Sequence, residues 1–231
     1  MGGAPFLETL DEPTMALLKR RWLRKRWMRG ETILVHGETG ADVYFVVEGM
    51  ARASVMSEDG KSVSYTEFVA GDIFGEFAAI DQAPRSTDVV AVTDMTVARL
   101  PGAAFRGLVE EDPGFTWALL RHFADVSRQM NQRVYEFSTL LVRERLVREL
   151  VRLARIGTPE GASIVVAPAP THQELAARIS THREAVSREM SRLSKMGLVR
   201  RISGTLVISE IERLRELSLD GIADDGVENA L

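Results

Sequence analysis

The stretch THQELAARISTHREAVSREMSRLSKMGLVRRISGTLVI, residues 171–208, determines the fold that we expect for the C-terminal part of the chain. Thr171 and Thr181 each begin a Thr-x-x-Glu sequence, and they lie ten residues apart. This is the capping box, in which the hydroxyl accepts a hydrogen bond from a backbone N–H and the Glu side chain reaches back to the helix start. A third box runs from Ser209 to Glu212. The sequence therefore predicts three helix starts.

The first two boxes predict a pair of closely spaced helices. We expect a short helix over residues 172–178, a tight turn, and a second helix over residues 182–195 that Gly197 ends as a C-cap. Residues 202–208, with Ser203-Gly204 at their centre, predict a small hairpin. This order is typical of a winged helix-turn-helix.

The second helix carries side chains suited to reading DNA. Arg183 and Arg188 can donate paired hydrogen bonds to guanine, and Glu184 can accept one from cytosine. A recognition helix enters the major groove with its N-terminal residues leading, so we expect these three to lie within reach of adjacent base pairs. Ser187 is presented on the same turns and is a further candidate for contact with DNA. The candidates for phosphate contacts are Thr171, His182, Arg192, Arg201, Lys195 and Arg200.

Local charge supports this interpretation, although the whole chain has a net charge of −4. Residues 171–208 hold seven basic and three acidic residues, a net charge of +4. Positive charge favours binding to the phosphate backbone of double-stranded DNA. The alternative is a surface ion pair between Glu184 and Arg188, four residues apart on one helix.

A long helix is predicted upstream of this unit. Neither Pro nor Gly occurs after Gly114 until about Arg155, and a helix over residues 114–138 would be about 37 Å long. Apolar residues recur every three or four positions, which predicts one stripe and a seam between two subunits. The alternative is that the stripe packs on the chain's own N-terminal domain. The stripe comprises Leu119, Phe123, Val126, Met130, Val134 and Phe137.

Short β-rich runs fill residues 30–100 and are separated by glycine turns. This spacing predicts a β-barrel or sandwich, and Asp59-Gly60 predicts a hairpin turn. A basic cluster precedes the runs, from Lys19 to Arg29, and its simplest interpretation is a solvated helix face. The runs are Thr32–Val35, Val43–Val47, Ala51–Met56, Ser62–Val69, Thr87–Val92 and Thr96–Leu100.

One constellation within this region suits an anionic ligand. Gly75 allows a sharp backbone turn, and the residues from Glu76 to Ile80 can form a helical turn with free N–H groups. Arg85 can bind a phosphate through two hydrogen bonds, and Ser86 can add a hydroxyl donor. Glu76 can accept a hydrogen bond from a sugar hydroxyl. The alternative is that Glu76 and Arg85 form a structural ion pair.

Composition excludes several classes of protein. The 231 residues contain no Cys, which rules out disulfides and cysteine-ligated zinc or iron–sulfur sites. No apolar run approaches the length of a membrane span, and no signal peptide is evident, so we expect a cytoplasmic protein. No nucleophile–base pair or metal cluster is recognisable, so we expect neither an enzyme nor a metal site.

Two motifs carry a family resemblance: the helix-turn-helix of residues 171–208, and Gly75-Glu76 followed by Arg85-Ser86. On these motifs, the chain resembles the Crp/Fnr family of transcription regulators over residues 25–210. The resemblance implies an α+β fold: a jelly-roll β-barrel that binds a cyclic nucleotide (residues 1–112), a long dimerisation helix (113–139), a winged helix-turn-helix (140–220) and an acidic, disordered tail (221–231). It implies a homodimer that binds cAMP or cGMP, reads an inverted repeat in DNA and contacts RNA polymerase. The ligand would meet Gly75, Glu76, Phe77, Ala78, Arg85, Ser86, Thr87, Met130 and Asn131.

The sequence departs from the family pattern at several positions. Met130 and Asn131 stand where the cAMP-binding members carry a Thr-Ser pair, and Asn131 could bond either adenine or guanine. Ser180 occupies a turn position often held by Gly, and His182 replaces a small hydroxyl residue. A haem sensor is not expected, because His36, His122, His172 and His182 do not form a plausible ligand arrangement.

Two other functions remain open from the sequence. The chain could be a DNA-binding regulator of the same family whose sensor domain is vestigial or holds another ligand. It could also be a cyclic-nucleotide-binding module that acts on a protein partner.

Overall fold

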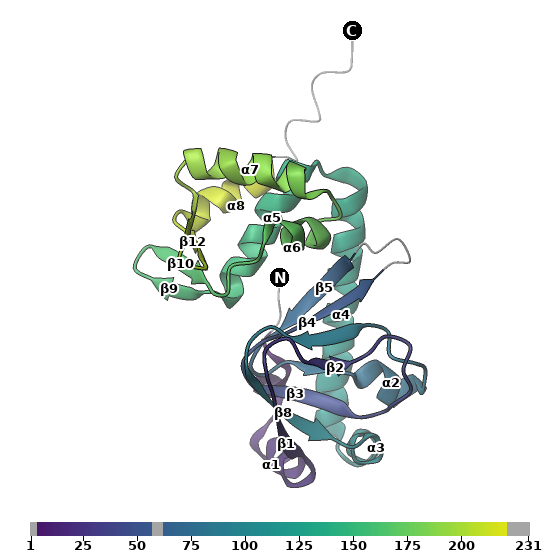
Figure 1. Ribbon diagram of the computed structural model, residues 1–231. Coiled ribbons are helices and arrows are strands. Elements are labelled where there is room, and N and C mark those ends of the chain that lie inside the picture. The colour runs from purple at the N-terminus through teal and green to yellow at the C-terminus, as the bar shows by residue number, and fades with distance from the viewer. Residues whose placement is uncertain (1–3, 57–61, 221–231) are drawn as a thin grey trace. The chain divides into compact units, whose positions relative to one another are not determined.

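The computed structural model describes residues 4–56 and 62–220 of the chain. The chain divides into two compact units, residues 1–130 and 131–231, and the division falls within one long helix. Figure 1 labels the elements of both units. The predicted acidic tail, residues 221–231, lies outside the described residues.

The first unit holds two four-stranded antiparallel sheets (Figure 1). All six predicted strands are confirmed, each to within one residue at either end. The predicted Asp59-Gly60 turn lies outside the described residues, but the strands on either side pair with Met56 opposite Ser62. One sheet is ordered β1 (Leu23–Trp27), β8 (Met95–Leu100), β3 (Val43–Glu48), β6 (Ile73–Phe74), and the other β2 (Thr32–Leu34), β7 (Asp88–Ala91), β4 (Ala51–Met56), β5 (Ser62–Phe68).

Strand β3 is buried on both faces. Tyr44 and Val46 pack in the cluster shared by the two sheets, while Val43 and Phe45 pack against helices on the opposite face. A strand covered on both sides reads as a continuous apolar run instead of an alternating one, as the sequence VYFVV does. The helical side of this core is formed by η1 (Phe6–Thr9), α1 (Glu12–Arg21), α3 (Gly102–Glu111) and the start of α4 (Pro113–Thr139).

The basic cluster from Lys19 to Arg29 is not one helix face, and that interpretation was wrong. Lys19, Arg20 and Arg21 end α1, but the chain then forms strand β1, which pairs with β8. β1 lies at the edge of its sheet, and its charged side chains are exposed. Charged side chains on an edge strand discourage pairing with another chain, which explains their position without a helix.

Helix α4 runs from Pro113 to Thr139, the same residues that the resemblance implies for the long helix and one residue more at each end than the range 114–138 used for its length. Its predicted stripe does not lie on one exposed face. Leu119 is only 4% exposed and belongs to the core of the first unit, against which Phe123 also packs. Trp117, 63% exposed, and Leu120 instead present apolar surface on this part of the helix. Of the stripe, Met130, Val134 and Phe137 are exposed.

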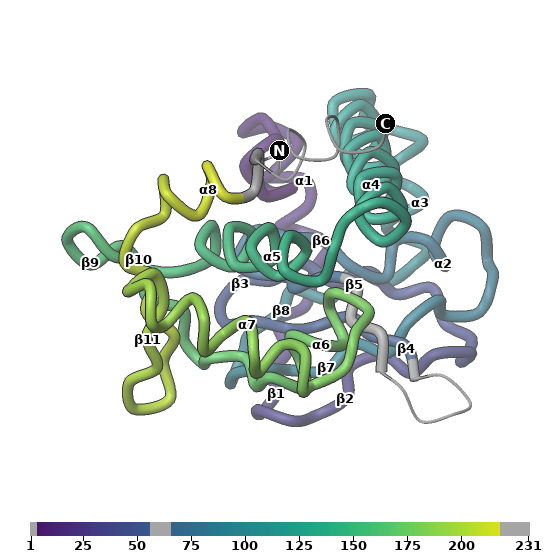
Figure 2. The backbone as a smooth tube through the Cα atoms, turned by 90° about the horizontal axis from the view of Figure 1, so that it is seen from above, coloured from purple at the N-terminus to yellow at the C-terminus, as the bar shows by residue number. Residues whose placement is uncertain are grey.

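The second unit is a winged helix-turn-helix, as predicted. Helix α5 contacts α8, α7 and α6 (Figure 2), and the hairpin of β11 and β12 follows α7. The elements are α5 (Val142–Ile156), β9 (Thr158–Glu160), β10 (Ser163–Val166), α6 (His172–Arg178), α7 (Arg183–Lys195), β11 (Val199–Ile202), β12 (Thr205–Ile208) and α8 (Ile211–Asp220). None of the described helices is long and apolar enough to cross a membrane.

The three predicted capping boxes have different outcomes. At Thr171 the box is present: its hydroxyl accepts from the N–H of Glu174 and its own N–H donates to the Glu174 carboxylate. Helix α7 is capped by His182 without a side-chain hydrogen bond, so the Thr181 box was wrong. Helix α8 begins at Ile211 and not directly after Ser209. Thr181 instead continues the turn that leaves α6, where its N–H donates to the carbonyl of Ala176.

Candidate functional site

The candidate effector site begins at the end of strand β6. Gly75 follows Phe74 with φ of +84°, a left-handed conformation that glycine adopts without steric cost. A Cβ atom at Gly75 would lie 3.0 Å from the Arg85 guanidinium and 3.0 Å from the carbonyl oxygen of Asp42. Glycine therefore lets Arg85 pack directly against the backbone before helix α2 (Glu76–Asp81) begins.

Arg85 is a buried cation that backbone carbonyls hold in place. It is 6% exposed, and its guanidinium donates to the carbonyls of Gly75 at 2.8 Å and Asp42 at 2.9 Å. Burial lowers the pKa of Arg85, against the opposing influence of Tyr44, Asp42 and Glu76, but an arginine remains charged in proteins. Among the described residues no carboxylate lies within ion-pair distance of it. The expected alternative, a Glu76–Arg85 ion pair, is therefore not formed.

Glu76 has a different partner, which the sequence did not predict. Its side chain is 5% exposed, and its carboxylate lies 3.2 Å from Nε2 of His122 on α4. The two residues are 46 positions apart in the chain. The predicted role of Glu76 needs a buried carboxylate held in a fixed orientation, and this contact provides one.

The other predicted ligand residues differ in exposure. Ala78 is buried, Thr87 is half-buried and Ser86 is exposed. Phe77 is exposed and packs edge-on against Phe123, with ring centroids 5.3 Å apart. Met130 and Asn131, predicted to meet the base, are exposed residues of α4 at the boundary between the two units.

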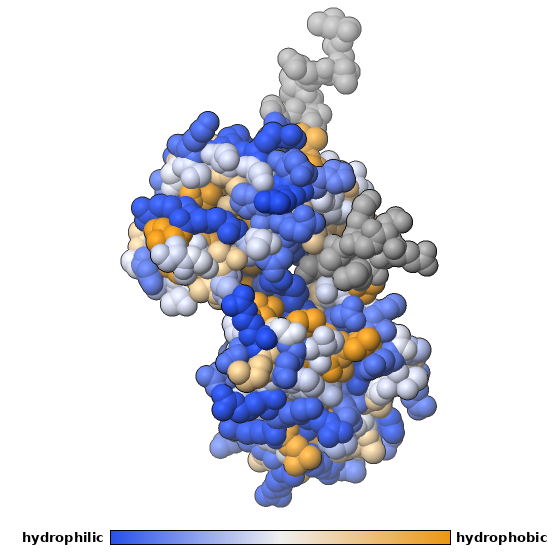
Figure 3. All heavy atoms as spheres, in the orientation of Figure 1, coloured by the Kyte–Doolittle hydropathy of each residue, from blue (hydrophilic) through white to orange (hydrophobic). Residues whose placement is uncertain are grey.

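The recognition helix α7 has the predicted two faces. Val186, Met190 and Leu193 are buried in the core of the second unit. Arg183, Glu184 and Arg188 are exposed near its N-terminal end, on a unit whose visible surface is largely hydrophilic (Figure 3). The described structure places no ion pair between Glu184 and Arg188, so both side chains are available to a ligand. Ser180, in the turn before α7, has φ of +51°, as its glycine-like position suggested.

Several predicted DNA contacts already have partners in the protein. Ser187 is half-buried, and its hydroxyl lies 2.8 Å from Nδ1 of His172. Burial and the charges of Arg201 and Arg183 lower the pKa of His172. Arg192 pairs with Glu189 at 2.8 Å, and Arg201 donates to the carbonyl of Pro170.

A buried charge cluster, also unpredicted, joins α4, α5 and α6 within the second unit. Glu149, only 1% exposed, lies within 3.2 Å of the guanidinium groups of Arg133, Arg152 and Arg178. Glu136 of α4 adds a second buried carboxylate, 2.8 Å from Arg152. Burial would raise the pKa of Glu149, but the three arginines outweigh it and hold the pKa below its usual value.

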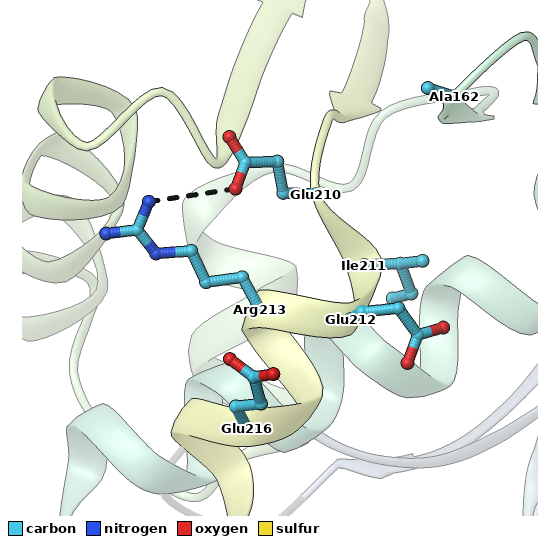
Figure 4. A pocket seen from close by; sticks show the side chains of 6 residues that line it. All are labelled: Ala162, Glu210, Ile211, Glu212, Arg213 and Glu216. Atoms are coloured by element: carbon cyan, nitrogen blue, oxygen red, sulfur yellow. Dashed lines mark ion pairs between the residues drawn. The ribbon is translucent and has the colours of Figure 1, made fainter.

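A shallow hollow at the start of α8 does not suit an anionic ligand (Figure 4). Glu210, Glu212 and Glu216 line it, together with Arg213, which pairs with Glu210. Its negative rim would repel a nucleotide phosphate or DNA. Within the described residues no group of His, Asp and Glu could hold a metal ion.

Comparison with known proteins is consistent with both halves of this description. Residues 24–112 match the cyclic nucleotide-binding domain, and residues 144–217 match the Crp-like helix-turn-helix domain. The chain is 26% identical over 212 residues to the CRP-like cAMP-activated global transcriptional regulator of Mycobacterium tuberculosis, covering 91% of this chain and 95% of the relative. It is 28% identical over 218 residues to the cyclic AMP receptor protein of Thermus thermophilus, covering 94% and 98%.

Among solved structures, the c-di-GMP responsive global regulator CLP of Xanthomonas campestris matches with a TM-score of 0.74 and 19% identity, over 86% of this chain and 99% of the other. That similarity shows a shared fold. The two matched domains together cover most of the chain, and they follow each other in the same order as the two sequence motifs. The chain belongs to the Crp/Fnr family of DNA-binding transcription regulators, with an N-terminal cyclic nucleotide-binding domain and a C-terminal Crp-like helix-turn-helix domain.

Proposed function

We propose that this protein is a homodimeric transcription regulator that binds a cyclic nucleotide, cAMP first and cGMP as the second choice, and then reads an inverted repeat in DNA. Effector binding would shift the balance between two orientations of the DNA-binding units. The curated relatives from Mycobacterium tuberculosis and Thermus thermophilus are named for cAMP, which supports cAMP as the first choice.

The proposal that the protein binds a cyclic nucleotide rests on the burial of Arg85 and on its hydrogen bonds. A buried cation is costly unless it is paired, and the hydrogen-bond acceptors that meet Arg85 among the described residues are two backbone carbonyls. An arginine has five N–H groups, and in the described part of the structure two of them are engaged by those carbonyls. The other three are left for an anion, and a cyclic phosphate has the charge and the acceptor atoms to meet them.

The remaining ligand contacts follow from the family resemblance and the burial of each group. Glu76 would accept a hydrogen bond from the ribose 2′-hydroxyl, and Ser86 would donate to the phosphate. Asn131 would bond the purine, because its amide both donates and accepts. Met130 and Thr87 would complete the contacts around the base and phosphate.

The dimer interface that we propose is revised by the burial of Leu119. Trp117 and Leu120 are exposed, and with Ala124, Ser127, Asn131 and Val134 they follow the alternating three–four spacing of a coiled-coil seam, in which Ser127 and Asn131 are polar. Val134 continues this seam, and Met130 and Phe137 lie beside it as further exposed apolar residues. Two copies of α4 would bury this surface against each other.

DNA recognition is proposed for the exposed end of α7. Arg183, Glu184 and Arg188 would contact bases, because they are exposed and suited to guanine and cytosine. Thr171, His182, Ser187, Arg192 and Arg201 would position the helix on the phosphates. Contact with RNA polymerase is proposed on the family resemblance alone.

Isothermal titration calorimetry of the full chain with cAMP, cGMP and c-di-GMP, in separate experiments, tests the effector. We expect binding of cAMP that is lost in R85L and weakened in R85K, because lysine keeps the charge but not the paired geometry. Circular dichroism of both variants checks that they fold. Binding of none of the three nucleotides would refute the cyclic-nucleotide mechanism and leave a DNA-binding regulator with another ligand or a vestigial sensor.

A further inference from the structure

We propose that His122 of α4 is a positioning residue of the effector site, which holds the carboxylate of Glu76 in the orientation that meets the ligand's hydroxyl group. This inference rests on the proposed function, because it concerns how the same site recognises ribose. It adds to the site a residue from the first half of α4, upstream of Met130 and Asn131, which we propose meet the base.

The hydrogen-bond geometry assigns the roles within the pair. Nε2 of His122 lies 3.2 Å from Oε1 of Glu76. A carboxylate only accepts hydrogen bonds, so Nε2 carries the proton and donates. One carboxylate oxygen is thereby fixed. The second, Oε2, has no hydrogen-bond partner among the residues that the structure describes, and it is left for a hydroxyl donor from the ligand.

Burial makes this bond important for Glu76. Its side chain is 5% exposed, and a carboxylate removed from water needs a partner. Arg85, the other charged residue of the site, is engaged by the carbonyls of Gly75 and Asp42. Within the described residues, His122 is therefore the side chain that holds the Glu76 carboxylate.

The imidazole ring of His122 is itself held in place. The ring of Phe6 lies edge-on to it with centroids 5.8 Å apart, and Phe123 does so at 5.6 Å. Such a ring can fix Glu76 before the ligand arrives, and a preorganised contact improves affinity because less freedom is lost on binding.

The proposal predicts an effect confined to one atom of the ligand. If His122 acts through Glu76 on the ribose 2′-hydroxyl, its contribution should vanish for 2′-deoxy-cAMP, which lacks that group. A purely structural role would instead weaken the binding of both nucleotides equally. The ratio of the two dissociation constants therefore separates the two roles.

The test measures the dissociation constants of cAMP and 2′-deoxy-cAMP for the wild type, H122F and H122Q by isothermal titration calorimetry. H122F keeps an aromatic ring between Phe6 and Phe123 but removes the donor, and H122Q keeps an N–H donor. We expect H122F to weaken cAMP binding about tenfold, the value of one hydrogen bond to a charged group, and to leave 2′-deoxy-cAMP unchanged. H122Q should recover most of the loss.

H36Q serves as the matched control, because His36 is an exposed histidine of the same unit. It should bind both nucleotides as the wild type does. If H122F does not fold, as judged by circular dichroism, H122L is measured under the same criteria. Equal losses for both nucleotides, or no loss, would overturn the role of His122 alone. If the wild type binds cGMP instead of cAMP, the same comparison is made with 2′-deoxy-cGMP. Binding of none of the cyclic nucleotides would overturn the proposed function and this role together.

Discussion

Replacing Glu149 by Gln should destabilise the second unit strongly. Glu149 is 1% exposed and accepts charge-assisted hydrogen bonds from arginines on α5 and α6, with a third arginine, from α4, 3.0 Å away. Removing one partner of a buried ion pair costs about 3–5 kcal/mol, because the remaining charge stays buried without compensation. E149Q keeps the size of the side chain and leaves three guanidinium groups without this carboxylate. We therefore expect a loss of at least about 3 kcal/mol in the free energy of unfolding.

Urea unfolding followed by circular dichroism measures this loss. With a slope of about 2 kcal/mol per molar urea, the midpoint of the transition should fall by about 1.5 M. E212Q is the control, because Glu212 pairs with Arg215 on the surface of α8, and an exposed pair is worth less than about 1 kcal/mol. A midpoint of E149Q indistinguishable from that of E212Q would refute the idea that the buried cluster stabilises the unit.

The pH dependence of the unfolding free energy of E149Q, relative to the wild type, provides a second measure of the contribution of Glu149. Because the arginines lower the pKa of Glu149 in the folded chain, its contribution is present above the ordinary Glu pKa of about 4.3. The contribution is lost as the pH falls through the lower, folded value. The difference in unfolding free energy between the wild type and E149Q should therefore narrow below about pH 4. A difference that stays constant down to pH 2 would show that the carboxylate charge is not its source.

Three further predictions concern the other parts of the chain. L119A should lower the unfolding free energy of the first unit by about 2–5 kcal/mol in urea titrations, because Leu119 is in its core. W117S should instead change the oligomeric state, measured as molar mass by light scattering. An unchanged molar mass would argue against the revised seam. T171A should lower the unfolding free energy, measured by thermal denaturation, by about 1 kcal/mol. T181A should lower it much less, because of these two threonines only Thr171 caps a helix. Equal losses for the two variants would contradict the assignment of the cap. R183A should relax base preference in competition gel shifts, and equal losses on specific and random DNA would remove Arg183 from the base contacts.

The parts of the fold that depend on local sequence could be predicted. The six strands, the Thr171 box and the ends of α6 and α7 follow from patterns within about ten residues. Ser180, at a turn position often held by Gly, has a positive φ. The seam on α4 could not be chosen in the same way, because apolar residues at Leu119 and at Leu120 both fit a repeat of three and four. Only the packing of Leu119 in the first unit shows which set faces inward.

The residues that sequence analysis missed act over long separations. His122 reaches Glu76 across 46 positions, and Arg178 reaches Glu149 across 29. No spacing rule connects such pairs, since each depends on how whole elements pack. From the sequence alone, His122 is a candidate only for ligation of haem iron, and a haem site is not expected. The signal that could have found it is the position of His122 three residues after Leu119, on the same side of the predicted helix as the apolar stripe.

Helix α4 places Leu119 in the core of the first unit and leaves Leu120 exposed one position later. One added or deleted residue turns everything downstream by about 100° around the helix axis and moves it about 1.5 Å along that axis. A substitution in α4 changes one contact, but such an insertion would misalign every exposed apolar residue beyond it at once. An insertion of seven residues would restore the facing direction to within about 20°. In the dimer that we propose, this helix would tolerate substitutions better than changes of length, and it would tolerate changes of length best in steps of whole heptads.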